Sequence, residues 1–376
     1  MIRPCFGFPA AVLLAAASSA AFAEDRYVVA HCMVCCSPSV AFSPDAKSAE
    51  REDLPSYLKP VAMPVPELER HRHDPLECAR AEVRLARHAG LDAFGLFQLG
   101  FVRKGSYREQ MHGYWRAAQE DGTFKVFPEV WAFKDEAGVE TLREDIRELL
   151  AKYESAWFRI DGRYVIMVAG GGLPDGLLDR LCEPLGGRRK AYVAYWSVPR
   201  REDYESVKAY YHRPTPLEKS READALLVGD ATDYGESLAM SAAGAHYAAD
   251  AGRELWHQAR PAACIRRHNH AGFLWERLGH ASYYADWMRA IGDSKARVMY
   301  VFTWNDPAED SGIVPDVTHG YAYLELTRHF AARFKTGRPP AGDPERVYVF
   351  HHPQVTEREV ALPPGTPSCV RHNQQR

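Results

Sequence analysis

The chain has 376 residues, 46% of them hydrophobic and 26% charged, and its formal net charge at pH 7 is -3. This balance excludes the basic excess of a nucleic-acid-binding protein, and the length allows either one large α/β barrel or two average domains. Aromatic residues make up 11% of the chain, with 8 Trp and 19 Tyr. Their flat apolar faces suit a cleft that binds a neutral sugar.

The first 23 residues are typical of a signal peptide. Arg3 supplies a positive start, residues 6–17 form an apolar run, and Ala21-Phe22-Ala23 matches a small-x-small cleavage site. The apolar run is too short to span a bilayer. We therefore expect an exported protein, secreted or periplasmic, that begins near Glu24 and has no membrane partner after the signal is removed.

Export changes the interpretation of the cysteines, because disulfides can form outside the cytosol. Cys5 belongs to the signal peptide, which leaves seven of the 8 cysteines, so at least one has no partner within the chain. Three of them lie in the segment "CMVCC" at 32–36, but no second Cys-x-x-Cys motif accompanies it. We expect buried thiols or one disulfide here rather than a metal site.

Apolar runs of strand length alternate with segments of helical periodicity along the mature chain. The runs are almost continuously apolar, as in a parallel sheet that is covered by helices. We expect strands at 26–34, 91–99, 124–133, 163–169, 191–196, 223–229, 262–265 and 297–304. We expect helices at 76–90, 107–120, 140–153, 175–185, 203–222, 236–258, 275–291 and 318–335.

Eight βα units in succession indicate a (β/α)8 TIM barrel over residues 24–338, followed by a short C-terminal extension at 339–376. The alternative is a doubly wound open sheet. That fold would place a Gly-rich nucleotide-binding turn after the first strand. The Gly-rich segment "AGGGLPDG" (169–176) instead follows the fourth strand and lacks the GxGxxG spacing.

Chemistry in a TIM barrel concentrates at the C-terminal ends of the strands. At these ends the sequence offers carboxylates, amides and indoles, which are the groups that a sugar cleft needs. The candidate substrate-binding residues there are His31, Gln98, Glu129, Trp131, Trp196, Asp230, Trp304 and Asn305.

Two pairs of acids share the spacing of an Asp followed three positions later by a Glu. Asp233 and Glu236 precede a long helix-favouring run, so they fit a helix capping box. Asp306 and Glu309 directly follow the last strand, and the next good helical pattern begins only near Thr318. Because a loop at this position favours catalysis over capping, we predict that Asp306 and Glu309 are the catalytic acids.

Five further segments carry a family resemblance in their order along the chain. They are "VVAHCMV", "HAGLDAFGLFQLG", "FLWERLGHASYYADWMRAIGD", "VFTWNDPAED" and "YAYLELTRHFAARFKTGRPP". Together they resemble glycoside hydrolase family 71, the endo-α-1,3-glucanases or mutanases, and the related family 99-like barrels. The acidic segment departs from the family's usual Trp-Asn-Asp-Tyr-Gly-Glu-Ser, because Pro307-Ala308 replace Tyr-Gly and Asp310 replaces Ser. In the extension, "RVYVFHHP" (346–353) is similar to the start of the family's C-terminal β domain.

The resemblance implies a barrel that hydrolyses α-glucosidic bonds, above all those of α-1,3-glucan, with Asp306 and Glu309 as the acid and the base. It also implies sugar contacts for Asp92, in the second-strand motif, and for His31, in the first. The partner is then a polysaccharide or oligosaccharide, and no metal or cofactor is required. Two alternatives stay open: a family 99-like hydrolase of α-mannan or another exopolysaccharide, and a non-catalytic glycan-binding barrel.

Overall fold

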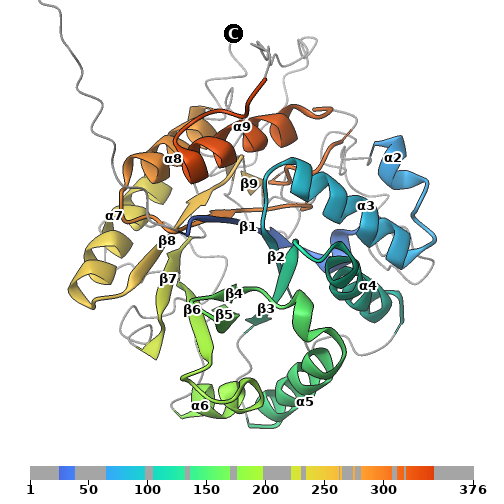
Figure 1. The fold of residues 1–376 in the computed structure, drawn as a ribbon. Coiled ribbons are helices and arrows are strands. Elements are labelled where there is room, and N and C mark those ends of the chain that lie inside the picture. The colour runs from blue at the N-terminus through green and yellow to red at the C-terminus, as the bar shows by residue number, and fades with distance from the viewer. Residues whose placement is uncertain are drawn as a thin grey trace, which may run out of the picture.

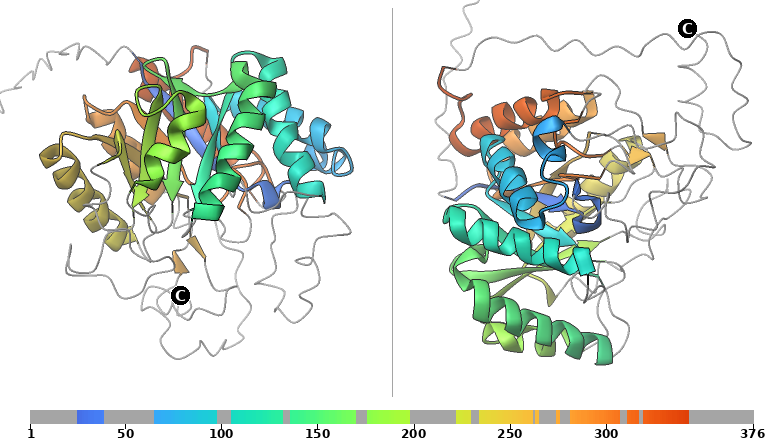
Figure 2. Two further views of the ribbon diagram at one scale, coloured as in Figure 1. Left: turned by 90° about the horizontal axis from the view of Figure 1, so that it is seen from below. Right: turned by 90° about the vertical axis from the view of Figure 1, so that its right-hand side faces the viewer.

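The computed structural model describes residues 25–38, 65–97, 105–131, 136–169, 176–197, 222–229, 234–261, 263–264, 274–275, 281–306, 311–316 and 319–342. In this part of the chain, eight parallel strands close into a barrel that is surrounded by helices (Figure 1). The side views show the helices outside the strands (Figure 2). The predicted (β/α)8 barrel is therefore confirmed. The predicted signal peptide, almost all of the predicted helix at 203–222 and most of the extension lie outside the described residues.

The barrel is formed by strands that pair in parallel around a closed ring. They are β1 Tyr27–Cys32, β2 Ala93–Phe97, β3 Lys125–Trp131, β5 Arg163–Ala169, β6 Ala191–Ser197, β7 Ala225–Val228, β8 Glu254–Ala259 and β11 Val298–Val301. Short β4, Arg159–Ile160, pairs antiparallel with β5, and β9, Ala263–Cys264, pairs with β10, Leu274–Trp275. The sheet order is β3-β2-β1-β11-β8-β7-β6-β5-β4, and pairing of β3 with β5 closes the barrel.

The described helices lie between successive strands and cover the outside of the barrel. The α-helices are α2 Pro66–Glu69, α3 Pro75–His88, α4 Gly105–Asp121, α5 Glu136–Tyr153, α6 Leu177–Cys182, α7 Tyr234–Asp250, α8 Ala281–Gly292 and α9 Ala322–Thr336. The 3-10 helices are η1 Val34–Cys36, η3 Glu154–Ala156 and η4 Glu183–Leu185. Within the described residues, no helix has the length and apolar character needed to span a membrane.

The seventh barrel strand lies earlier in the chain than the sequence predicts. It is β8, whereas the predicted strand at 262–265 overlaps only the two-residue β9. The predicted helix at 236–258 ends with α7, because the chain turns at Gly252, whose φ of 63° favours glycine. The helical run and the strand are therefore separate elements.

Alternate side chains of each strand face the barrel interior or the helices. Val29 and Tyr300 belong to a cluster of buried side chains inside the barrel. Val28 and Met299, one position away, belong to the larger cluster between strands and helices. Both faces of the sheet are thus buried, which explains why the strands are almost continuously apolar.

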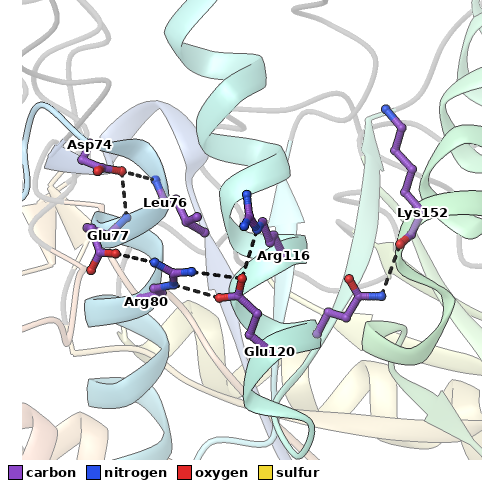
Figure 3. A network of polar contacts seen from close by, with 8 residues as sticks. Asp74, Leu76, Glu77, Arg80, Arg116, Glu120 and Lys152 are labelled. Carbon is purple, nitrogen blue, oxygen red and sulfur yellow. Dashed lines mark hydrogen bonds and ion pairs between the residues drawn. The ribbon is translucent and has the colours of Figure 1, made fainter.

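Helices α3 and α4 are neighbours on the outside of the barrel and are joined by charged side chains (Figure 3). Helix α3 starts where Asp74 accepts hydrogen bonds from the amides of Leu76 and Glu77, both at 3.1 Å. Arg80 then donates to Glu120 of α4 at 2.8 and 3.0 Å. Exposed ion pairs contribute about 1 kcal/mol or less each, so the buried faces of these helices provide most of the stability.

Asp92 joins β1 to helix α9 at the N-terminal end of the barrel. It directly precedes β2, and its carboxylate accepts a hydrogen bond from the Val28 amide at 2.8 Å. The Lys335 ammonium of α9 lies 2.6 Å from the same carboxylate. Asp92 is therefore at the opposite end of the barrel from the C-terminal strand ends. We correct the predicted sugar contact of Asp92 to a structural role.

A second aspartate repeats this arrangement on the other side of the barrel. Asp224 directly precedes β7 and accepts a hydrogen bond from the Val193 amide at 2.8 Å. Arg163 donates to the Asp224 carboxylate at 2.6 Å. At both positions the aspartate therefore joins the starts of neighbouring strands.

We expect Asp92→Ala to lower the free energy of unfolding by about 1 to 2 kcal/mol, because the Val28 amide and the Lys335 ammonium lose their acceptor. Urea unfolding followed by circular dichroism measures the loss. Lys335→Met is the matched partner for a double-mutant cycle, in which the two losses should sum to more than the loss in the double variant. Strictly additive losses would show that the pair contributes nothing.

Candidate active site

A buried hydrogen-bond network lies inside the barrel and joins side chains from three strands. His31 of β1 places Nδ1 2.5 Å from Oε2 of Glu129 in β3. Tyr300 of β11 donates its hydroxyl hydrogen to Oε1 of the same carboxyl group. All three residues are at most 2% exposed. Three strands that are far apart in the sequence therefore converge on one carboxyl group.

The surroundings of Glu129 are suited to a buried acid. Burial raises the pKa of the Tyr300 hydroxyl well above its ordinary value, and the adjacent Glu129 carboxyl raises it further. The hydroxyl therefore stays protonated at neutral pH and acts as a donor. Gly95 of β2 provides the space, because a Cβ atom at this residue would lie 1.8 Å from Glu129 Oε1.

Aromatic rings enclose the His31 imidazole. Phe302 stacks on it with a centroid distance of 4.8 Å and an interplanar angle of 12°. Phe97 and Trp196 meet it edge-on, with centroids at 4.9 and 5.7 Å. These rings, together with Glu129, fix the orientation of the imidazole. The structure thus brings together three of the predicted site residues, His31, Glu129 and Trp196.

Arg260 places a buried cation beside this aromatic cluster. It directly follows β8 and is 2% exposed. Its guanidinium lies over the Phe302 ring, 3.9 Å from the centroid. Its backbone amide donates to Oδ2 of Asp286 in α8 at 3.4 Å. The residue therefore joins the barrel interior to a surrounding helix.

Asp306 lies on a loop that leaves the end of β11. The Trp304 amide donates to the His31 carbonyl at 2.6 Å, so the loop starts beside β1. The Asp306 amide donates to the Thr303 hydroxyl at 2.9 Å, and the Ser311 amide donates to the Asp306 carbonyl at 3.2 Å. Asp306 itself is 5% exposed. These bonds fix the Asp306 backbone at the C-terminal end of the barrel.

A fully buried carboxyl group, that of Glu82 in α3, holds the same loop. Trp304 Nε1 donates to Glu82 Oε2 at 2.7 Å, and Asn305 Nδ2 does so at 3.4 Å. Ser37, which follows η1, donates its hydroxyl hydrogen to Glu82 Oε1 at 2.8 Å. Burial raises the pKa of Glu82, and the hydrogen bonds from Trp304 and Ser37 act in the opposite direction. One carboxyl group thus joins the segments that follow β1 and β11.

Trp304 and Asn305 are consequently corrected from sugar contacts to loop anchors. Trp304 is completely buried and packs in the cluster between strands and helices. Asn305 is 2% exposed, and its Oδ1 accepts a hydrogen bond from the Met33 amide at 2.8 Å. Their polar atoms contact Glu82 and Met33, and these contacts hold both side chains in the packed interior around the loop.

Other predicted residues lie outside the part of the chain that the structure describes. They are Gln98, Asp230, Asp233 and Glu309. Trp131 ends β3 and Glu236 lies in α7, but the side chains of these two residues are outside the described part of the structure. Their roles stay predictions, as does the capping box.

The sequence prediction misses three residues of this region. Glu82 lies on the apolar face of an amphipathic helix, between Cys78 and Leu85, and an acid at that position is a signal of a buried role. Tyr300 is detectable as an inward residue from the two-residue period of β11. Arg260 is not detectable, because the strand before it reads as the end of a helix.

The cysteines of "CMVCC" lie at the end of β1 and in η1. Cys32 is completely buried, whereas Cys35 and Cys36 are partly exposed. Within the described ranges, no group of three or more His, Cys, Asp and Glu side chains is arranged to hold a metal ion. In the described structure, the three cysteines of this segment are thiols.

Comparison with known proteins identifies similar folds. No protein-family model matches the sequence, and no curated protein matches it. A structure of the GH99 endo-alpha-mannosidase from Bacteroides thetaiotaomicron with bis-tris-propane is 15% identical, with a TM-score of 0.59 over 83% of this chain and 98% of that chain. A second structure of the endo-alpha-mannosidase is 16% identical, with a TM-score of 0.51 over 71% of this chain and 81% of that chain. At these identities the likeness establishes the barrel fold.

We expect Glu82→Leu to lower the free energy of unfolding by about 3 kcal/mol or more, because the donors of Ser37, Trp304 and Asn305 are left buried without their acceptor. Glu82→Gln should lose only about 1 kcal/mol, since the amide oxygen can still accept and the Ser37 hydroxyl can reverse its direction. Urea unfolding measures both. Glu77→Gln, on the exposed side of α3, is the control, and equal losses for Leu and Gln would contradict the proposed hydrogen bonding.

The carboxyl group of Asp286 should make the stability of the folded protein depend on pH. Burial raises the pKa of its carboxyl to about 7, and Arg289 opposes this effect. An unfolded aspartate has a pKa of about 3.9. Between these values the folded state binds the extra proton, so the contribution of Asp286 is full below about pH 4 and is lost as the pH rises through 7.

Asp286→Asn should therefore flatten the pH dependence. Between pH 5 and pH 8, the free energy of unfolding should fall in the wild type by on the order of 2 kcal/mol more than in the variant. Urea unfolding at the two pH values provides the measurement. Asp179→Asn on α6 is the exposed control and should keep the wild-type slope. An unchanged slope in Asp286→Asn would contradict the assignment.

Proposed function

We propose that this chain is an exported glycoside hydrolase that cleaves α-glycosidic bonds in a polysaccharide. The carrying observation is the hydrogen-bonded loop that fixes the Asp306 backbone directly after the last barrel strand. Enzymes with a TIM-barrel fold carry their catalytic groups at this end of the barrel. The fold likeness to an endo-alpha-mannosidase supports the same reaction class.

In this proposal Asp306 and Glu309 divide the work of acid and base. One carboxylic acid protonates the leaving oxygen, and the other carboxylate activates a water molecule. A rigid loop favours this chemistry because proton transfer depends on the position of both groups. The anchors Trp304 and Asn305 hold the segment up to Asp306 in place through Glu82 and Met33.

The interior network supports the loop from inside the barrel. The His31 carbonyl accepts the Trp304 amide, while its imidazole is held by Glu129 and Phe302. In this proposal His31, Glu129 and Trp196 form the floor beneath the substrate. Gln98, Trp131 and Asp230 are the proposed sugar contacts around it.

Two candidate substrates are each supported by a different observation. The sequence resemblance to family 71 favours α-1,3-glucan, with Asp306 and Glu309 in the family's acidic motif. The fold likeness to the endo-alpha-mannosidase makes α-mannan the second candidate. The signal-like residues 1–23 fit both, because extracellular polysaccharides require an exported enzyme.

Wild-type protein should release reducing sugar from α-1,3-glucan or, under the second candidate, from α-mannan, but not from dextran. Asp306→Asn and Glu309→Gln should each reduce the rate about 100-fold or more, because a positioned acid or base contributes a factor of that order. Reducing-end assays on purified variants measure the rates. Circular dichroism confirms that each variant is folded.

Asp233→Asn and Glu236→Gln form the matched control, since they have the same spacing but are predicted to cap a helix. Because Asn caps a helix about as well as Asp, these changes should alter stability by less than about 1 kcal/mol and leave the rate nearly unchanged. Full activity in Asp306→Asn and Glu309→Gln would overturn the assigned pair. Binding of these glycans without any release would instead indicate a non-catalytic glycan-binding barrel.

A further inference from the structure

Two adjacent cysteines lie in the turn that follows β1. Their sulfur atoms, Cys35 Sγ and Cys36 Sγ, are 3.9 Å apart. Both side chains are partly exposed, in contrast to the completely buried Cys32. A small oxidant in solution can therefore reach this pair, and the two sulfurs already face one another.

Joining these sulfurs would strain the chain. Adjacent Cα atoms are about 3.8 Å apart, whereas disulfides usually join Cα atoms separated by about 4.4 to 6.8 Å. Strained and exposed disulfides are easily reduced, and they are the labile or regulatory ones. A bond here would open and close with the redox environment, unlike a permanent structural crosslink.

We propose that Cys35 and Cys36 are a reversible oxidation site that closes into a vicinal disulfide. The oxidant is a small-molecule disulfide such as oxidised glutathione. One cysteine thiolate attacks it, forms a mixed disulfide and releases one glutathione thiolate. The neighbouring thiolate then attacks the protein sulfur of the mixed disulfide and expels the second glutathione. The protein loses two hydrogens, and one oxidised glutathione becomes two reduced ones.

The turn with this pair is flanked by residues that hold the Asp306 loop. Met33 donates its amide hydrogen to Asn305, and its carbonyl accepts the Cys36 amide at 2.9 Å. On the other side, Ser37 donates to Glu82. Closing a ring across residues 35 and 36 changes the backbone of the turn between these two anchors. Oxidation is thereby coupled to the position of the loop.

Mass spectrometry of the full chain tests the site. Protein that is reduced, exposed to oxidised glutathione and then alkylated should yield a peptide with Cys35 and Cys36 that lacks both alkyl groups and two hydrogens. Dithiothreitol should restore alkylation of both. Cys35→Ser and Cys36→Ser should each retain a glutathione adduct, because the resolving thiol is missing, and Cys182→Ser should behave like wild type.

Alkylation of both thiols in the oxidised wild-type protein would overturn the proposal, as would a disulfide from either thiol to Cys32 or Cys78. The single-serine variants cover the case in which the wild-type protein only accumulates glutathione adducts. Equal adduct levels in the wild type, Cys35→Ser and Cys36→Ser would show that neither thiol displaces glutathione from the other, which would also overturn the proposal.

The coupling to the loop rests on the proposed function and needs a separate readout. Glycan hydrolysis by the wild type should fall several-fold after oxidation and return after reduction, whereas the double variant Cys35→Ser/Cys36→Ser, which has neither thiol, should respond to neither treatment. A vicinal disulfide without any change in rate would overturn the coupling but not the site. Absence of hydrolysis before oxidation concerns the proposed function alone, and the mass measurement still decides the site.

Discussion

The arrangement of the candidate site depends on one buried carboxyl group, that of Glu82. It accepts hydrogen bonds from Ser37, Trp304 and Asn305, which belong to segments at opposite ends of the barrel sequence. A buried donor without an acceptor costs about 1 to 3 kcal/mol, so the three donors can be buried together only where this acceptor is present. The first and last strands meet here, and their following segments are fixed by the same group.

The interior of the barrel applies a similar constraint with different groups. Glu129 holds His31 and Tyr300, and Gly95 provides the volume that the carboxyl group occupies. The His31 carbonyl in turn accepts the Trp304 amide. The loop with Asp306 is therefore supported from inside by β1 and from outside by α3. Such two-sided support would keep Asp306 in position for the proton transfer that we propose for it.

The two ends of the barrel have different tasks. At the N-terminal end, Asp92 and Asp224 pair with cations and accept strand amides, which are stabilising roles. At the C-terminal end, buried polar groups gather around His31 and the Asp306 loop. This division is common in TIM barrels, in which conserved chemistry lies at one face and stability at the other. The repeated Asp-Ala-apolar pattern at residues 92 and 224 is the sequence sign of the stabilising role.

The sequence by itself determined the barrel, because eight apolar runs buried on both faces leave few other architectures. It also determined that His31 and Glu129 lie at strand ends, where the network forms. It could not separate β8 from α7, because Glu254, His257 and Gln258 interrupt the apolar pattern of β8 that marks the other strands. Nor could it place Trp304 outside and Trp196 inside the barrel. The direction of a side chain at a strand end depends on the partners it meets, and for Trp304 the partner is Glu82, 222 residues away in the chain.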